Sequence, residues 1–250
     1  MSDSAIVVGV GARAGVGAAA CRRFAREGLH VFAAGRTEEK LQAVADEVAE
    51  SPEVASGGRV TPVVADATSA ADVVRVFETA EKEAGVPSLV VYNAGNNRLR
   101  PLLEMDDAFF EDVWRLCCFG GFLVGREAAR RMLPSGGGRG GTLVFTGATA
   151  SVRARPPFTA FASAKAALRA VAHGMAREFG PQGLHVGHVV IDGGIDGDQL
   201  NSRFPQFKET RGDDGMLSPD AIADAFWALH VQHRSAWTLE LDLRPYKETF

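Results

Sequence analysis

The sequence predicts an α/β protein in which a doubly wound, mostly parallel sheet is covered by helices on both faces. Three observations lead to this class. Strand-like apolar runs alternate with helix-like runs along all 250 residues. Glycines gather at positions 9, 11, 15 and 17, between the first apolar run and the first helical run. No internal repeat or long linker divides the chain, so we expect residues 1–250 to form a single domain.

Each element is predicted from its own residue pattern. Strands are expected where short β-branched and apolar runs occur, at residues 6–8, 30–35, 60–65, 88–92, 142–146, 184–191 and 237–243. Helices are expected where apolar residues recur at helical spacing, at residues 18–25, 38–50, 70–84, 106–132, 158–179 and 218–230. Ser218 and Pro219 are typical first residues of the last helix. Residues 193–215 are expected to be irregular.

Composition argues against several classes of protein. The net charge of −4 gives no basic surface for nucleic acid, and no apolar run approaches the roughly 20 residues that span a bilayer. We therefore expect neither a nucleic acid nor a membrane as partner. Cys21, Cys117 and Cys118 are odd in number and two are neighbours, which argues against a disulfide framework. With the first strand beginning by Ala5 and no signal peptide before it, we expect a cytoplasmic protein.

The glycine cluster is the first candidate binding site. The letters V-G-A-R-A-G-V-G, from Val10 to Gly17, join the first strand to the first helix. A helix that begins there has free N–H groups and the positive end of its dipole, which suit a pyrophosphate. On its own, such a pattern could mark only a tight turn. The candidate residues of this loop are Gly11, Arg13, Ala14, Gly15, Val16 and Gly17.

Together with this loop, two later motifs resemble the short-chain dehydrogenase/reductase family. They are Asn93-Ala94-Gly95 and the helix that carries Lys165, in the order and spacing of the family. The resemblance covers essentially the whole chain, although Val10 stands where the family usually has Thr. It implies a Rossmann domain with a seven-stranded sheet, an oxidoreductase activity on a small-molecule substrate, and a homodimer or homotetramer built from the two long helices.

The end of the second strand predicts the choice of cofactor. An NAD-selective fold usually has Asp or Glu there, which repels a 2′-phosphate. This strand ends instead in Gly35-Arg36, followed by Thr37, and Arg13 lies in the glycine loop. A guanidinium matches the geometry of a phosphate, so the sequence favours NADP(H) over NAD(H). The alternative is that Arg36 is only a solvated residue at a strand end.

The resemblance adds further cofactor contacts beyond the glycine loop. They are Asp66, Ala67, Asn93, Ala94, Gly95, Lys165, Gly193 and Ile195. Asp66 falls where the family holds the adenine amino group, although Asp66 and Thr68 could also cap the following helix. The Thr that usually follows Gly193 and Ile195 in the family is missing. Asp192 and Asp196 would repel a nearby cofactor phosphate or could accept a hydrogen bond from the substrate, but turn residues are the preferred interpretation.

The catalytic positions depart from the family. The usual Tyr-x-x-x-Lys is Phe161-Ala162-Ser163-Ala164-Lys165, so the lysine is present and the phenol is absent. The usual Ser position is Ala148 and the usual Asn position is Cys117. The enoyl-reductase branch of the family spaces its Tyr and Lys more widely, but the residue at that Tyr position is Phe158. Phenylalanine transfers no proton, so the usual route of proton transfer is closed.

Three functions remain open on this reading. The leading one is an NADP(H)-dependent oxidoreductase with a degenerate tetrad, acting on an imine or an activated carbonyl that needs little acid help. The second is an NADP(H)-binding sensor or inactive subunit, and the third is an isomerase or dehydratase on the same scaffold. Substitute hydroxyls are available at Thr149, Ser151, Thr159 and Ser163.

No metal site is expected. His185 and His188, and His230 and His233, are spaced by three, and on a strand this spacing puts side chains on opposite faces. No acidic or cysteine cluster completes either pair. Near the expected mouth of the active site, Arg153 and Arg155 could steer an anionic substrate, but a solvated loop is the preferred interpretation.

Overall fold

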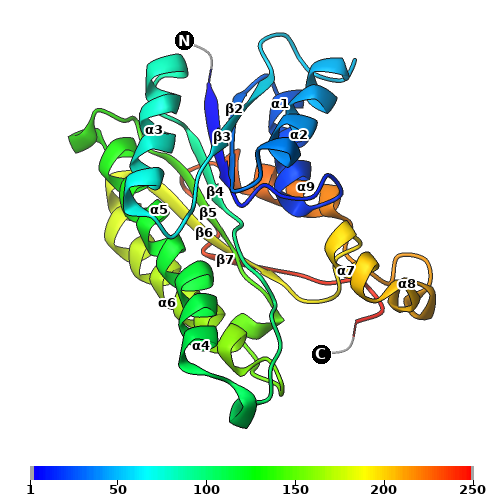
Figure 1. Cartoon of the computed structure of the whole chain (residues 1–250). Helices are drawn as coiled ribbons and strands as arrows, with labels where there is room; N and C mark the ends of the chain where they lie inside the picture. The colour runs from blue at the N-terminus through cyan, green and yellow to red at the C-terminus, as the bar shows by residue number, and fades with distance from the viewer. Residues whose placement is uncertain (1–2, 249–250) are drawn as a thin grey trace.

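A computed structural model describes residues 3–248 and shows one seven-stranded parallel sheet (Figure 1). The strand order is β3-β2-β1-β4-β5-β6-β7, and every neighbouring pair is parallel. The strands are β1 Ser4–Val8, β2 His30–Gly35, β3 Arg59–Val64, β4 Leu89–Tyr92, β5 Gly141–Thr146, β6 Leu184–Ile191 and β7 Glu240–Leu243. The predicted fold class is confirmed.

Helices cover both faces of this sheet. The helices are α1 Val16–Arg26, α2 Glu38–Glu50, α3 Ala70–Ala84, α4 Asp107–Trp114, α5 Gly120–Met132, α6 Thr159–Phe179, α7 Asp198–Arg203, α8 Pro205–Arg211 and α9 Pro219–His230. The buried residues of α1, α2 and α9 form one apolar cluster with the sheet, and those of α3, α5 and α6 form the cluster on the other face. Figure 1 shows the two groups of helices on opposite sides of the strands.

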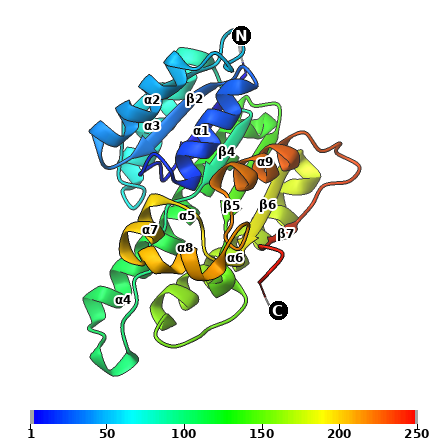
Figure 2. The ribbon, with the colours of Figure 1, turned by 90° about the vertical axis from the view of Figure 1, so that its right-hand side faces the viewer.

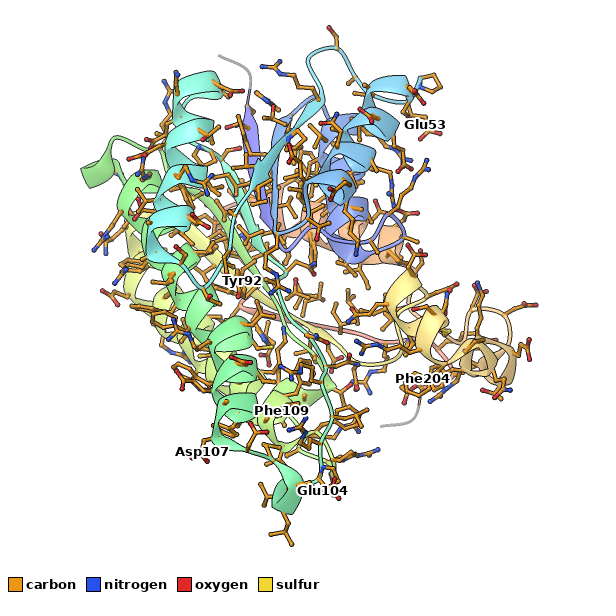
Figure 3. All side chains as sticks on the ribbon, viewed as in Figure 1. Glu53, Tyr92, Glu104, Asp107, Phe109 and Phe204 are labelled. Carbon is orange, nitrogen blue, oxygen red and sulfur yellow. The ribbon has the colours of Figure 1, made fainter. Side chains whose placement is uncertain are left out.

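The structure corrects three expected element boundaries. The helix expected over residues 106–132 is α4 and α5 joined by a π-helical turn, Arg115–Phe119. Tyr92 explains the position of this turn, because its buried hydroxyl donates a hydrogen bond to the carbonyl of Leu116 and its ring lies at the centre of the molecule (Figure 3). The last strand begins at Glu240 rather than at residue 237, and the short helices α7 and α8 occupy part of the segment expected to be irregular.

The order of the strands reverses between β1 and β4. β1 is followed by the loop that leads to α1, whereas β4 is followed by Asn93 and the chain toward α4. Ligands of open parallel sheets bind at such a reversal, outside the carboxyl ends of the strands. Gly9 holds the two loops together: its φ is +98°, and a Cβ there would lie 2.3 Å from the backbone nitrogen of Ala94.

The two edges of the sheet differ in chemistry. β3 forms one edge and carries Pro62 within its paired stretch. β7 forms the other edge and carries Glu240 and Asp242. Within residues 3–248, no helix has the length and apolar character that a bilayer crossing needs.

Candidate active site

The glycine loop presents unpaired backbone N–H groups at the start of α1. Gly15 is the N-cap residue, no side chain caps the helix, and its first turn has no acidic residue. The loop turns tightly, with Gly15 N donating to Ala12 O at 3.0 Å. A Cβ at Gly17 would lie 2.7 Å from Gly9 O, so only glycine fits between α1 and the end of β1. A bare helix N-terminus with close backbone approach fits a pyrophosphate.

The two arginines that favoured NADP(H) have different surroundings. Arg13 donates to Glu47 on α2 at 2.8 Å, so its guanidinium is already paired. Arg36, at the end of β2, is exposed, and its side chain forms no hydrogen bond or ion pair with the residues that the structure describes. Arg36 is therefore the guanidinium available to a 2′-phosphate, and Arg13 is not free for that role in this conformation.

The carboxylate of Asp66 orders the loop after β3. Its Oδ1 accepts hydrogen bonds from Thr68 N and Thr68 Oγ1, both at 2.8 Å. Asp66 does not cap α3, because Ser69 is the N-cap and its hydroxyl accepts from Asp72 N at 3.3 Å. The capping interpretation of Asp66 and Thr68 is therefore wrong. Ala67 follows in the same loop and is buried.

Asn93 ties the end of β4 to the end of β1. Its amide nitrogen Nδ2 donates to Gly9 O at 3.1 Å, and its backbone nitrogen donates to Val8 O at 2.8 Å. Ala94 is buried, and Gly95 faces Lys165: a Cβ at Gly95 would lie 3.3 Å from Lys165 Nζ and 3.8 Å from Cys117 Sγ. The structure thus brings together the Asn93–Gly95 turn, Lys165 and Cys117, which the sequence assigned to one site.

Lys165 is a buried cation on α6. Its Nζ donates to the carbonyl of Thr146 at the end of β5, at 2.7 Å, and the residue is 4 % exposed. Burial lowers the pKa of Lys165. The ring of Phe161 lies one turn earlier on α6, with its centroid 5.8 Å from Nζ. A benzyl group therefore stands beside the ammonium.

The neighbouring hydroxyls are largely committed to other partners. Ser163 Oγ donates to Ala160 O on its own helix at 2.8 Å, and Ser151 Oγ accepts from Ala148 N at 3.1 Å. Tyr92 is not free for this chemistry, because its hydroxyl is buried against Leu116 and burial raises its pKa well above the usual range. Thr159 is exposed.

Asp192 holds a buried polar cluster at the end of β6, which corrects the turn interpretation. It is 3 % exposed, accepts from Thr149 Oγ1 at 2.7 Å, and pairs with Arg153 at 2.8 Å and Arg244 at 3.3 Å. Arg153 is therefore a structural partner of Asp192 rather than a solvated residue. Sequence reasoning missed the Thr149–Asp192 contact because 43 residues separate the two.

The segment after Asp192 lies near the glycine loop. Gly193 has a φ of +155°, and Ile195 pairs with Leu217 through an isolated parallel bridge. Asp196 forms an ion pair with Lys208 at 2.8 Å. Two residues further, Asp198 Oδ2 accepts a hydrogen bond from Ala14 N at 3.2 Å. This contact spans 184 residues and had no signal in the sequence.

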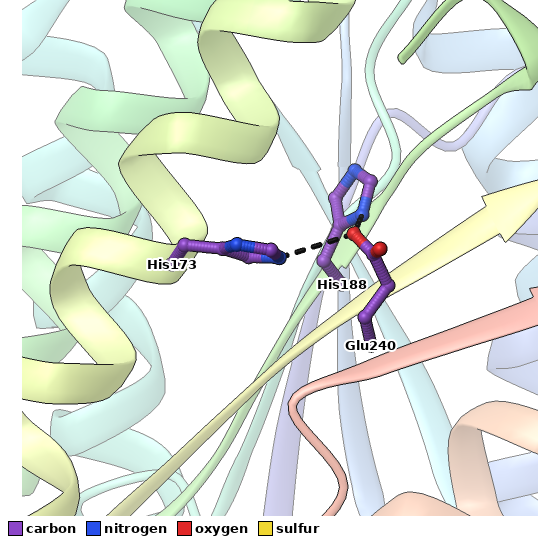
Figure 4. A group of neighbouring side chains, drawn as sticks. All are labelled: His173, His188 and Glu240. Atoms are coloured by element: carbon purple, nitrogen blue, oxygen red, sulfur yellow. Dashed lines mark hydrogen bonds and ion pairs between the residues drawn. The ribbon is translucent and has the colours of Figure 1, made fainter. Parts of the chain in front are cut away.

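A cluster of His173, His188 and Glu240 lies beside β7 (Figure 4), with ligand-type atoms within 4.8 Å of one another. Sequence reasoning missed it because the three residues come from α6, β6 and β7. Arg169 donates to both oxygens of Glu240, at 2.6 and 2.7 Å, and lowers the pKa of Glu240 to about 2. This carboxylate already neutralises a cation, and both histidines lie 3.0 Å from the same oxygen. The cluster is best described as a hydrogen-bond network.

The family is shown by comparison with known proteins. The family model of the short chain dehydrogenases matches residues 5–206. The chain therefore belongs to the short-chain dehydrogenase family, whose members are oxidoreductases that bind nicotinamide cofactors.

Individual relatives agree with this assignment. An uncharacterized oxidoreductase, YuxG of Bacillus subtilis (strain 168), is 33% identical over 226 residues, which are 90% of this chain and 31% of that longer protein. The A-factor type gamma-butyrolactone 1'-reductase (1S-forming) of Streptomyces virginiae is 33% identical over 180 residues, 72% of this chain and 67% of that protein.

Solved structures show the same architecture. A short-chain dehydrogenase from Rhodopseudomonas palustris has a TM-score of 0.80 at 37% identity and covers 98% of this chain and 99% of its own. A point variant of the actinorhodin polyketide ketoreductase, solved with NADPH, has a TM-score of 0.84 at 20% identity. The match covers 98% of this chain and 96% of the ketoreductase chain. At that identity the second likeness supports the fold alone.

Proposed function

We propose that this chain is an NADP(H)-dependent oxidoreductase whose substrate needs no proton from a side chain, such as an imine or an activated carbonyl compound. The observation that carries the proposal is the pair formed by the buried Lys165 ammonium and the ring of Phe161, 5.8 Å apart. The site keeps the cation of the family and lacks its acid. A reaction that proceeds there must find its proton in the substrate or in water.

The residues present fit a nicotinamide dinucleotide. The uncapped N-terminus of α1 can bind the pyrophosphate, and the exposed Arg36 can pair with a 2′-phosphate. Asp66 and Ala67 follow the carboxyl end of β3, and the Asn93–Gly95 turn follows that of β4. Gly193 and Ile195 follow the carboxyl end of β6, so all of these residues lie on the same side of the parallel sheet. When bound, the cofactor supplies or accepts hydride.

In this proposal, Lys165 binds and orients the cofactor through its ammonium group. Its Nζ is fixed by Thr146 O and lies close to Gly95, where it can donate to ribose hydroxyls. The lowered pKa of the buried ammonium leaves it a stronger hydrogen-bond donor than a solvated lysine. The ring of Phe161 offers no proton beside this ammonium, which favours a substrate that arrives already protonated or strongly polarised.

Binding and turnover test the proposal separately. Titration with NADPH and NADH is expected to show tighter binding of NADPH, and a panel of imines, ketones and enones is expected to oxidise NADPH with imines or activated ketones preferred. Binding without oxidation by any compound would indicate the sensor or inactive subunit instead. Protein that binds neither nucleotide at millimolar concentration would contradict both.

A further inference from the structure

α7 and the residues before it lie across the point where the strand order reverses, outside the carboxyl ends of β1 and β4. On one side, Asp198 Oδ2 accepts from Ala14 N of the glycine loop, at 3.2 Å. On the other side, Gln199 Nε2 donates to Asn96 Oδ1, beyond β4, at 3.3 Å. Figure 2 shows α7 just beyond the N-terminal end of α1. We call residues 196–203 the strap, because they bond to both the loop after β1 and the chain after β4.

The strap approaches the glycine loop closely. A Cβ at Gly197 would lie 2.5 Å from Ala14 O, so a side chain at this position would push the two backbones apart. At its base, the strap is held by Asp196 N, which donates to Leu217 O at 2.8 Å, and by the bridge between Ile195 and Leu217. The backbone of residues 195–197 is thus held in a position that brings the strap against Ala14.

Asp198 brings an unneutralised charge to this contact. In the part of the chain that the structure describes, the Asp198 carboxylate has no ion pair with a lysine or arginine, whereas Asp196 pairs with Lys208. The nearby guanidinium groups have other partners: Arg13 pairs with Glu47, and Arg22 pairs with Glu47 and Asp220. A backbone N–H of the loop therefore donates to a carboxylate of the protein itself that has no cationic partner among residues 3–248.

We propose that Asp198 is an internal competitor for the phosphate-binding loop and limits the affinity for dinucleotide. The inference rests on the proposed function, because it needs a cofactor whose phosphates occupy this loop. A phosphate and the Asp198 carboxylate cannot both use the Ala14 N–H, and like charges a few ångströms apart repel each other. Binding therefore requires the strap to move away from Ala14 or to tolerate this repulsion.

Titration of three variants with NADPH tests the competition. Asp198→Asn removes the charge and keeps the side-chain shape, and Asp198→Ala removes the contact as well. Both are expected to lower the Kd for NADPH about fivefold to tenfold, the effect of removing one like charge near the loop. Asp213→Asn is the matched control, because Asp213 is exposed in the turn after α8 and its loss changes the net charge equally.

The outcomes separate this inference from the proposed function. Tighter binding by both Asp198 variants, with Asp213→Asn unchanged, supports the competition. Equal Kd values for wild type and both Asp198 variants, or an equal gain in Asp213→Asn, overturn it while leaving the proposed function intact. If no variant binds NADPH or NADH, the proposed function fails and this inference fails with it. Circular dichroism of each variant confirms that the fold is retained.

Discussion

At the scale of single residues, the chemistry depends on what stands beside the Lys165 ammonium. The phenyl ring of Phe161 offers only its π face, and Cys117 contributes a buried thiol near Gly95. Neither Ala148 nor Phe161 donates a hydrogen bond through its side chain. Under the proposed function, hydride transfer and proton transfer are therefore expected to be uncoupled.

Restoring the phenol tests this uncoupling. Phe161→Tyr places a hydroxyl next to the Lys165 cation, which lowers a tyrosine pKa and enables proton transfer to a ketone oxygen. We expect kcat/KM for simple ketones to rise at least about tenfold, since general acid catalysis contributes 10²–10⁴-fold in well-formed sites. Steady-state NADPH oxidation measures the effect. Phe158→Tyr, at the N-cap of α6, is the matched control, and an equal gain there would contradict the assignment of Phe161.

Arg36 is expected to set the preference between the two cofactors. Arg36→Ala removes the unpaired guanidinium at the end of β2, and we expect NADPH to bind about 10–100-fold more weakly, as for the loss of a charge-assisted hydrogen bond. Affinity for NADH should change little, because it has no 2′-phosphate. Isothermal titration of both nucleotides checks this. Arg13→Ala serves as comparison, since Arg13 is bound to Glu47 and its loss should matter less.

At the scale of elements, the fold could be predicted from local patterns, whereas part of the site could not. β1, the glycine loop and α1 follow from one continuous stretch, and Lys165 follows from its spacing on α6. The Asp192–Arg153 ion pair and the Asp198–Ala14 hydrogen bond join segments that are far apart in sequence. These residues lie in loops and at the ends of elements, where no apolar periodicity predicts which segments come into contact. The π turn at Arg115 depends on Tyr92, a tertiary contact.

The contact between β1 and the turn after β4 is expected to be intolerant of a side chain. Gly9→Ala places a Cβ 2.3 Å from Ala94 N at a φ of +98°. Backbone strain and overpacking together should lower the free energy of unfolding by about 2–4 kcal/mol. Urea denaturation measures the loss. Gly174→Ala on α6 has no atom within 4 Å of the added Cβ, and should instead raise stability by about 0.5–1 kcal/mol.

We expect the protein to lose stability in mild acid, because His30 on β2 and His188 on β6 are buried. Burial lowers the pKa of His30 to about 4 and that of His188 to about 4, from an ordinary 6.5. Between pH 4 and pH 6.5, the unfolded chain therefore binds more protons than the native protein. The free energy of unfolding should fall as pH decreases from 6.5 to 4, by at most about 3 kcal/mol per histidine.

Denaturation across this pH range checks the prediction. His30→Gln should flatten the dependence between pH 6.5 and 4, while His233→Gln, at an exposed position, should leave it unchanged. A wild-type protein whose stability is constant from pH 6.5 to 4 would show that these histidines titrate alike in both states.

At the scale of the whole molecule, an exposed aromatic surface lies on α4, the π turn and α5. Phe110, Trp114 and Phe122 are 39%, 37% and 37% exposed, and Phe119 lies between Trp114 and Phe122. Large apolar side chains grouped in this way are typical of a protein interface. We predict that a second copy of the chain covers them, as the family resemblance of the two long helices implies.

A charged substitution tests this assembly. Trp114→Glu should shift the protein from a dimer or tetramer to a smaller species, because an unpaired carboxylate would be buried at the interface. Light scattering coupled to size-exclusion chromatography gives the mass. Val231→Glu, at a residue that is 59% exposed after α9, is the control and should not change the mass. A wild-type protein that is already monomeric at micromolar concentration would rule out the interface.

The unlike edges of the sheet also bear on how the chain avoids aggregation. On β3, Pro62 has no N–H to offer, so an unfolding intermediate cannot extend the sheet cleanly from that side. On β7, the edge carries charged side chains in ion pairs, Glu240 with Arg169 and Asp242 with Arg244, and such groups discourage the addition of another strand. Fibril growth is thus discouraged at one edge of the sheet by a missing backbone donor and at the other by charged side chains.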